Sequence, residues 1–321
     1  MLDSLVKALI VLVLAVLIDL TLGEPPLRVH PTVLMGKFID RGVEVAKRRS
    51  ARLQKAYGVG LALGTIIFFA GASCLILWVV NTLSEPVQIV CAVLLLKPTF
   101  SIRLMRSYAL KLASAIRRGD WAEAKAVLRH IVRRDPNSLN ESQIISAGVE
   151  SVAESTTDGI TSPLFFYALF GVPGAVAYRA INTLDSMLGY KDPSFINIGW
   201  FSAKLDSIAN WLPARLTAII TIISAALIGQ SASGAWRVLR RDRNCTASWN
   251  AGWVMSAMAG ALGVQLEKPG SYVLGNRDQE LSPNHIVRAT RILVMNTWLF
   301  IIFFVLPAML GVECVSGIIN H

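Results

Sequence analysis

The sequence predicts an all-α protein, a polytopic integral membrane bundle with amphipathic helices on its cytoplasmic side. Apolar residues make up 54% of the chain and charged residues only 16%, whereas a soluble domain is about 25% charged. Several windows carry almost no charge over about the length that a spanning helix needs. Basic residues are concentrated between these windows. We therefore expect residues 1–321 to form a single integral membrane domain.

The apolar windows differ in character. From Ala8 onward the first is interrupted only by Asp19, and the third is short enough to be half of a hairpin with the second. The sixth is rich in Gly, Ala and Met, which indicates packing inside a bundle rather than against lipid. The windows are 5–22, 57–80, 86–97, 159–178, 214–234, 250–266 and 292–312.

The distribution of positive charge predicts the orientation. Residues 23–56 hold eight Lys or Arg and residues 97–158 hold ten, whereas residues 81–85 hold none. Positive charge favours the cytoplasmic side, so the two basic segments are expected there. The net charge of +10 is then explained by topology and anionic lipid. No pattern typical of nucleic-acid binding is present.

The most water-compatible segment, 98–158, is expected to form cytoplasmic helices. Asp120 is placed to cap one helix and Asn140 to cap the next, with Gln143 completing a capping box.

Three carboxylates follow at a spacing of four residues: Glu150, Glu154 and Asp158. On one α-helix they share a face and repel one another. A divalent cation, a Lys or Arg side chain, or water could offset this repulsion. The simpler alternative is that the three carboxylates form a solvated cytoplasmic face. Because Mg²⁺ prefers oxygen ligands, we name the three as candidate metal ligands.

A second polar group lies between two apolar windows, from Arg179 to Arg215. Ionisable side chains at membrane depth are costly and usually functional, although Gly and Pro also punctuate this stretch as they would an ordinary loop. Asn250-Ala251-Gly252-Trp253 is a third candidate motif, although helix packing alone would explain its small residues. His30 belongs to a fourth candidate motif, although a lone histidine more often serves as a structural hydrogen-bonding residue.

These pieces, in this order, resemble the CobD/CbiB family of cobalamin biosynthesis, the adenosylcobinamide-phosphate synthases. The resemblance extends over nearly the whole chain. It departs in the lead into Asn250, where Cys245-Thr246-Ala247-Ser248-Trp249 stands in place of a basic or His-Pro-Ser-Pro type lead. The matching blocks are Gly23-Glu24-Pro25, His30-Pro31, Gly148–Asp158, Pro163-Leu164-Phe165, Tyr178-Arg179-Ala180, Asn182–Met187, Gly199-Trp200, Ala203–Asp206, Asn210–Leu216 and Asn250–Trp253.

The resemblance implies an ATP-dependent ligase that joins adenosylcobyric acid to an aminopropanol phosphate, with ATP and Mg²⁺ required. Asp185 and Asp206 are then candidate bases, and Lys204 joins them as a catalytic candidate. The substrate-binding candidates are Arg179, Asn182, Lys191, Trp200, Asn210, Arg215, Asn250 and Trp253.

The expected partners are the corrinoid and amino-alcohol phosphate substrates and the lipid bilayer, with no nucleic acid. A homo-oligomer or association with other pathway enzymes stays open. We expect a multi-pass protein of the cell membrane whose active site is reached from the cytoplasm, although a simple count of spans would place residues 182–212 outside. A corrinoid-binding protein or transporter without catalysis, or a scaffold, is the alternative.

Overall fold

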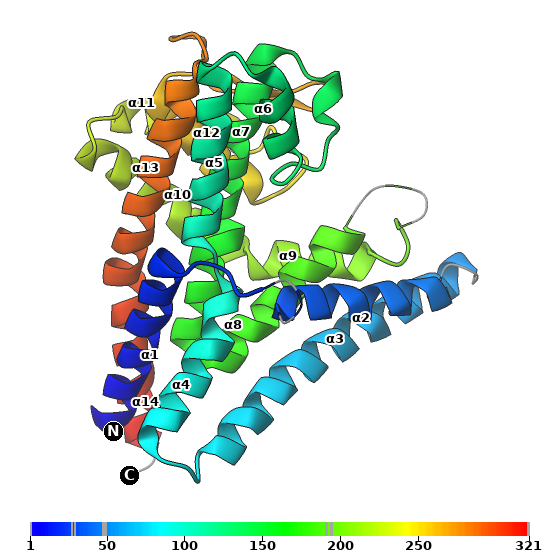
Figure 1. The fold of residues 1–321 in the computed structure, drawn as a ribbon, viewed down its shortest axis with the longest axis vertical. Helices are drawn as coiled ribbons and strands as arrows, with labels where there is room; N and C mark the ends of the chain where they lie inside the picture. The colour runs from blue at the N-terminus through cyan, green and yellow to red at the C-terminus, as the bar shows by residue number, and fades with distance from the viewer. Residues whose placement is uncertain are drawn as a thin grey trace. The chain divides into compact units, whose positions relative to one another are not determined.

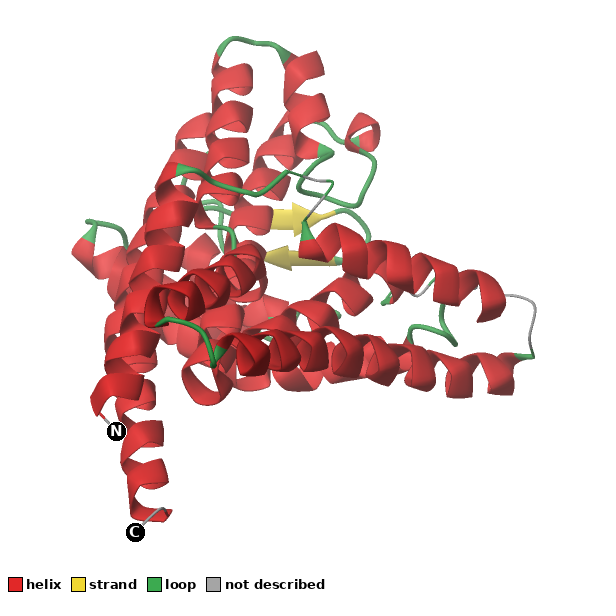
Figure 2. Cartoon of the chain, turned by 60° about the horizontal axis from the view of Figure 1, so that its bottom comes forward, coloured by secondary structure: helices red, strands yellow, loops and turns green. Residues whose placement is uncertain are grey.

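The computed structural model describes residues 2–26, 28, 30–46, 50–189, 192 and 195–319 and is almost entirely helical (Figures 1 and 2). This confirms the predicted fold class. The contacts divide the chain into two compact units: unit 1 (1–101, 162–209 and 305–321) and unit 2 (102–161 and 210–304). The sequence does not predict this division, and the single-domain organisation stays a prediction.

Five helical runs are long and apolar enough to cross a membrane, or six if the consecutive helices α9 and α10 are counted together. The runs are Ser4–Thr21, Ala51–Val80, Glu85–Arg117, Glu141–Leu188 and Pro283–Val315. The chain is therefore a multi-pass membrane protein, as expected. The second run carries many exposed apolar side chains, including Ile67 and Trp78, which suits a surface that faces lipid.

Unit 1 is built from seven α-helices and one 3₁₀ turn within the described residues. They are α1 (Leu2–Thr21), α2 (Pro31–Ala46), α3 (Ala51–Val80), α4 (Glu85–Leu96), η1 (Lys97–Thr99), α8 (Ser162–Leu188), α9 (Trp200–Ala209) and α14 (Leu306–Ile319). The helices α2, α3 and α8 enclose an apolar core that includes Ile39, Leu61 and Leu184. A side chain at Gly199 would overlap the carbonyl of Leu188, so glycine there lets the chain return closely against α8.

Helix α8 is broken where the sequence places Pro173 in an apolar window. Gly171 has φ 65° and ψ −160°, a conformation that glycine adopts without penalty. Proline also cannot donate the helical hydrogen bond. The window 159–178 is thus not one regular spanning helix.

Unit 2 combines helices with one short antiparallel hairpin, in which Leu266 pairs with Leu274. Its elements are α5 (Ile102–Arg117), α6 (Trp121–Leu128), η2 (Pro136–Ser138), α7 (Glu141–Thr156), the π-helical turn η3 (Thr157–Thr161), α10 (Trp211–Leu227), α11 (Ala232–Asp242), α12 (Ala251–Leu262), β1 (Leu266–Lys268), β2 (Tyr272–Leu274), α13 (Pro283–Phe300) and the π-helical turn η4 (Ile301–Val305), whose last residue belongs to unit 1.

Helix α12 confirms that the window 250–266 packs inside the protein. It is only 12 residues long, and its residues from Val254 to Leu262 are all buried. A side chain at Gly260 would overlap the carbonyl of Gly234 in α11, so small residues let these two helices approach closely.

Both predicted helix caps are present. The Asp120 side chain accepts from the Glu123 amide at 2.9 Å. Asn140 and Gln143 exchange side-chain and backbone hydrogen bonds as a capping box at the start of α7. These local interactions fix where α6 and α7 begin.

Candidate functional site

Unit 1 holds a closed group of charges, the Lys97 cluster, formed by Lys97, Asp19, Glu24 and His30. Lys97 Nζ lies 3.0 Å from Asp19 Oδ1 and 2.8 Å from Glu24 Oε2. The Lys97 and Asp19 side chains are 5% and 0% exposed, so this cation is compensated by carboxylates almost entirely out of water.

His30 completes the cluster from the start of α2. Its Nδ1 accepts the Thr32 amide hydrogen at 3.2 Å, which leaves Nε2 to donate to Glu24 Oε2 at 3.1 Å. Burial would raise the pKa of Glu24, but the hydrogen bonds from His30 and Lys97 outweigh it and hold that pKa below its ordinary value. Glu24 is therefore kept ionised.

Arg179 of α8 binds η1, the turn that contains Lys97. Arg179 Nε donates to the Thr99 carbonyl at 2.7 Å, Nη2 donates to the same oxygen, and Nη1 donates to Asn182 Oδ1 at 3.2 Å. Arg179 and Asn182 are three residues apart on α8, so both side chains lie on one face of the helix.

The three catalytic candidates lie on α8 and α9, which pack against each other. Asp185 lies near the end of α8. Its carboxylate occupies the space that a side chain at position 189 would fill, so Gly189 packs directly against it. On α9, Lys204 is exposed and Asp206 is half-buried, while Trp200 at the helix start is 48% exposed. Lys191 lies outside the described residues.

Unit 2 holds a different arrangement, the Arg215 clamp, formed by Arg215, Trp211, Trp253 and Asn250. The guanidinium carbon lies 4.3 Å from the Trp211 ring centroid and 4.6 Å from that of Trp253, within the range of cation–π attraction. Arg215 Nη1 donates to the Trp211 carbonyl at 2.5 Å and to Asn250 Oδ1 at 3.1 Å.

Helices α10 and α12 bring the clamp together. Three of the predicted substrate-binding residues, Arg215, Asn250 and Trp253, meet here although some 35 residues separate them in sequence. A fourth, Asn210, is buried at the start of α10. Among the residues that the structure describes, no carboxylate lies within ion-pair distance of Arg215.

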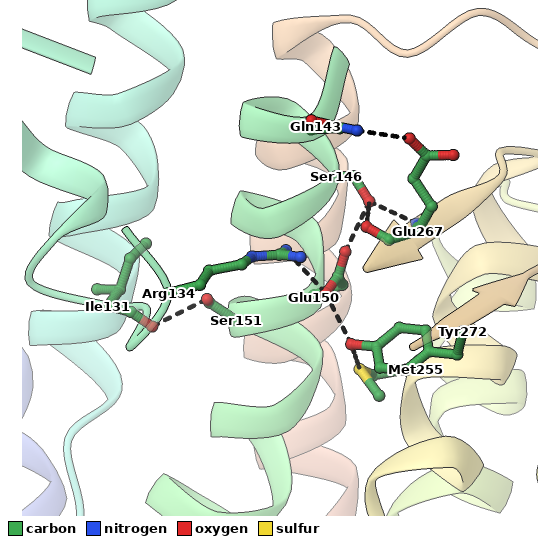
Figure 3. A network of polar contacts seen from close by, with 9 residues as sticks. All are labelled: Ile131, Arg134, Gln143, Ser146, Glu150, Ser151, Met255, Glu267 and Tyr272. Atoms are coloured by element: carbon green, nitrogen blue, oxygen red, sulfur yellow. Dashed lines mark hydrogen bonds and ion pairs between the residues drawn. The ribbon is translucent and has the colours of Figure 1, made fainter. Parts of the chain in front are cut away.

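The acidic triplet of unit 2 is arranged differently from the prediction. Figure 3 shows Glu150 inside a network: Oε1 accepts from Ser146 at 2.6 Å, and Oε2 accepts from Arg134 at 3.0 Å and from Tyr272 at 2.8 Å. Burial, followed by the charge of Glu150, raises the pKa of Tyr272. Glu150 therefore ties α7 to β2 and to the segment that carries Arg134.

The prediction that all three carboxylates share one α-helix is wrong for Asp158. Helix α7 ends at Thr156, and Asp158 lies in the π-helical turn η3, which changes the direction of the side chains that follow. Glu154 is exposed. Within the described part of the chain, no group of three His, Cys, Asp or Glu side chains is placed to hold a metal ion.

Lys97 is not among the candidate residues predicted from the sequence. Asp19, Glu24 and His30 were noted there, but not as candidate site residues. A signal was available: Asp19 is the one acidic residue inside the first apolar window, and Lys97 is the charge that ends the third. Opposite charges at the edges of two apolar windows are candidates for pairing.

Fold and polar centres together define an integral membrane protein with a buried ion cluster in one unit and an accessible cation in the other. The family model described as CobD/Cbib protein matches residues 12–293. The chain belongs to the CobD/CbiB family, which confirms the resemblance and gives it a role in cobalamin biosynthesis.

Individual relatives agree with this assignment. The probable cobalamin biosynthesis protein CobD of Methanothermobacter thermautotrophicus is 39% identical over 292 residues, 90% of this chain and 94% of its own. The protein named cobalamin biosynthesis protein CobD is 38% identical in Dehalococcoides mccartyi, over 87% of this chain and 91% of the relative. In Geobacter metallireducens it is 40% identical, over 80% of each chain. No solved structure matches the chain.

Proposed function

We propose that the protein is an ATP-dependent ligase that joins the free carboxylate of adenosylcobyric acid to the amine of (R)-1-amino-2-propanol O-phosphate. Ethanolamine phosphate is the alternative amine. The product is adenosylcobinamide phosphate. Family membership supports the pathway, and the Arg215 clamp is the observation that carries the chemistry.

The clamp suits the proposed substrates in two ways. An arginine without a carboxylate partner can take a phosphate or carboxylate through paired hydrogen bonds. The Trp211 ring, 52% exposed, offers an apolar face to a large flat corrin ring. Asn250 fixes the guanidinium and is also of the right type to meet corrin amides.

A carboxylate is a poor electrophile, so we assign the reaction two steps. The corrinoid carboxylate oxygen attacks the γ-phosphorus of ATP, ADP leaves, and an acyl phosphate forms. The amine nitrogen then attacks the acyl carbon, the C–N bond forms, and inorganic phosphate leaves with the C–O bond electrons. The ammonium proton must first pass to a base.

Asp185 and Asp206 are the proposed bases, because each carboxylate lies on a helix of the α8–α9 pair, which also carries Lys204. Lys204 and Arg179 supply positive charge on the same two helices and would offset the phosphates' charge. Asn182, Trp200, Asn210 and Lys191 keep their proposed roles in binding substrate.

Magnesium does not fit the acidic triplet as a protein-built site, since Glu150 is already satisfied by Ser146, Arg134 and Tyr272. Mg²⁺ is often held by one or two carboxylates together with substrate phosphates. We therefore include it only as the companion of ATP and assign it no step.

We further propose that the active site opens to the cytoplasm of the cell membrane, where ATP is available. The contact of Lys97 with Glu24 supports this, because two segments that begin in contact are expected on one side of the membrane. Their positive charge favours the cytoplasmic side for both.

A turnover assay on detergent-purified protein tests the reaction. Adenosylcobyric acid, aminopropanol phosphate, Mg²⁺ and ATP are supplied, and product is followed by mass. We expect no product without ATP, and a fall of roughly a hundredfold or more in kcat for Asp185→Asn or Asp206→Asn if that residue is the base. Asp40→Asn, an exposed change on α2, is the control. Saturable corrinoid binding without product would instead favour a binding protein or transporter.

A further inference from the structure

A groove in unit 2 is lined by none of the residues proposed for the reaction. It runs between α5 and α13, encloses about 450 Å³, and is lined by Arg106 of α5 and by Arg291, Val294, Met295 and Trp298 of α13, among others. We call it the Arg106–Arg291 groove. A second hollow of about 400 Å³ continues from Arg106 along α5 past Arg103 and Lys111.

The two arginines lie within about one helical turn of each other along the helix pair. Arg117 Nη2 donates to Asn284 Oδ1 at 2.7 Å, which ties the end of α5 to the start of α13, so the helices run in opposite directions. Arg106 lies about three turns before that tie and Arg291 about two turns after it. From there α13 becomes apolar and continues as part of the candidate span Pro283–Val315.

The charge of the groove is uncompensated. Arg106 and Arg291 are both exposed, and among the described residues neither has a carboxylate within ion-pair distance. No acidic side chain lines the groove. Its remaining walls are largely apolar, with Trp298 43% exposed.

We propose that the Arg106–Arg291 groove binds one anionic phospholipid of the surrounding bilayer. The two guanidinium groups take the phosphate, for which their planar donors are suited. An acyl chain lies along Val294, Met295 and Trp298. A free phosphate would leave that apolar wall without a partner, and a lipid tail covers it. Tryptophan beside basic residues is also typical of the membrane interface.

Lipid-binding measurements on delipidated, full-length protein test the proposal. Native mass spectrometry compares phosphatidylglycerol with phosphatidylcholine of the same acyl chains. We expect roughly tenfold tighter binding of phosphatidylglycerol by the unaltered protein. The double variant Arg106→Gln/Arg291→Gln should lose this preference. The control Arg129→Gln/Arg237→Gln removes the same charge from exposed positions outside the groove and should keep it.

Two further measurements complete the test. The first distinguishes a lipid headgroup from free phosphate as the ligand, and the second uses a variant that keeps both arginines. Inorganic phosphate at the same concentration should not displace phosphatidylglycerol, and Trp298→Ala should weaken binding of both lipids. The proposal is overturned if Arg106→Gln/Arg291→Gln keeps the preference. It is also overturned if Trp298→Ala binds both lipids as well as the unaltered protein, or if inorganic phosphate competes equally with phosphatidylglycerol.

Discussion

The Lys97 cluster of unit 1 and the Arg215 clamp of unit 2 each hold one cation, but they compensate it differently. Lys97 is surrounded by Asp19 and Glu24 and is 5% exposed. Arg215 is half-buried between two indole rings, one of them largely exposed, and is hydrogen-bonded only to neutral groups that the structure describes. The first arrangement leaves no positive charge available to an anionic ligand, whereas the second does.

Energetics give the same contrast. Removing one partner of a buried ion pair leaves a charge out of water and costs several kcal/mol of stability. A cation resting on aromatic faces gains about 0.5–2 kcal/mol from them and can still bind an anion. We infer that the Lys97 cluster chiefly holds unit 1 together, and we propose that the Arg215 clamp binds substrate.

The largest expected effect is on the Lys97 cluster. Lys97→Met leaves Asp19 and Glu24 facing each other without a cation, and should lower the free energy of unfolding by about 3–5 kcal/mol. Thermal unfolding in detergent measures this loss. Adding Asp19→Asn should restore part of the stability, because one of the two buried charges is then removed.

Lys125→Met, on a half-buried side chain of α6 without a described ion pair, is the matched control and should change stability little. If Lys97→Met unfolds at the same temperature as the unaltered protein, the cluster does not support the fold and the comparison fails.

A smaller effect is expected at Glu150, the compensated charge of unit 2. Tyr272→Phe keeps the ring and removes one of the donors to Glu150, so the loss should be about 1–2 kcal/mol, with kcat unchanged. Tyr108→Phe is the control, since Tyr108 stacks on His130. A large fall in kcat for Tyr272→Phe would show that the Glu150 network acts in the reaction.

The smallest effect concerns pH. The folded-state pKa of Glu24 lies below its ordinary value of 4.5, so its ionised form contributes stability above that pH, and the contribution is lost as pH falls through the folded pKa. Between about pH 5 and about pH 3, Tm should therefore fall more for the unaltered protein than for Glu24→Gln. Equal slopes would contradict the role assigned to Glu24.

Local patterns in the sequence predicted most of the helices. Uncharged windows located α1, α3, α4 and α10, because burial in lipid requires apolar residues over a fixed length. The caps at Asp120 and Asn140 were predictable because each bond joins residues three apart.

Features that depend on distant contacts were not predictable in this way. Lys97 meets Asp19 and Glu24 across more than seventy residues, and the hairpin 266–274 is anchored by Glu150 and Ser146 of α7. The π-helical turn at Thr157–Thr161 shifts Asp158 without a mark in the hydrophobic pattern. The candidate site was predicted in part. Motif residues pointed to Arg215, Asn250 and Trp253, and the block Asn210–Leu216 also contains Trp211, but no motif pointed to Lys97.

The most direct measurement compares Arg215→Gln with Arg240→Gln, an exposed arginine of α11, for both kcat/KM and Tm in the ATP-dependent assay. If Arg215 binds a substrate anion, Arg215→Gln should lower kcat/KM by roughly a hundredfold, as expected for a lost charge-assisted contact. Its Tm should stay within a few degrees of that of Arg240→Gln, which should turn over normally. Full turnover by Arg215→Gln, or a loss of activity that follows unfolding, would contradict the assignment of the clamp to substrate binding.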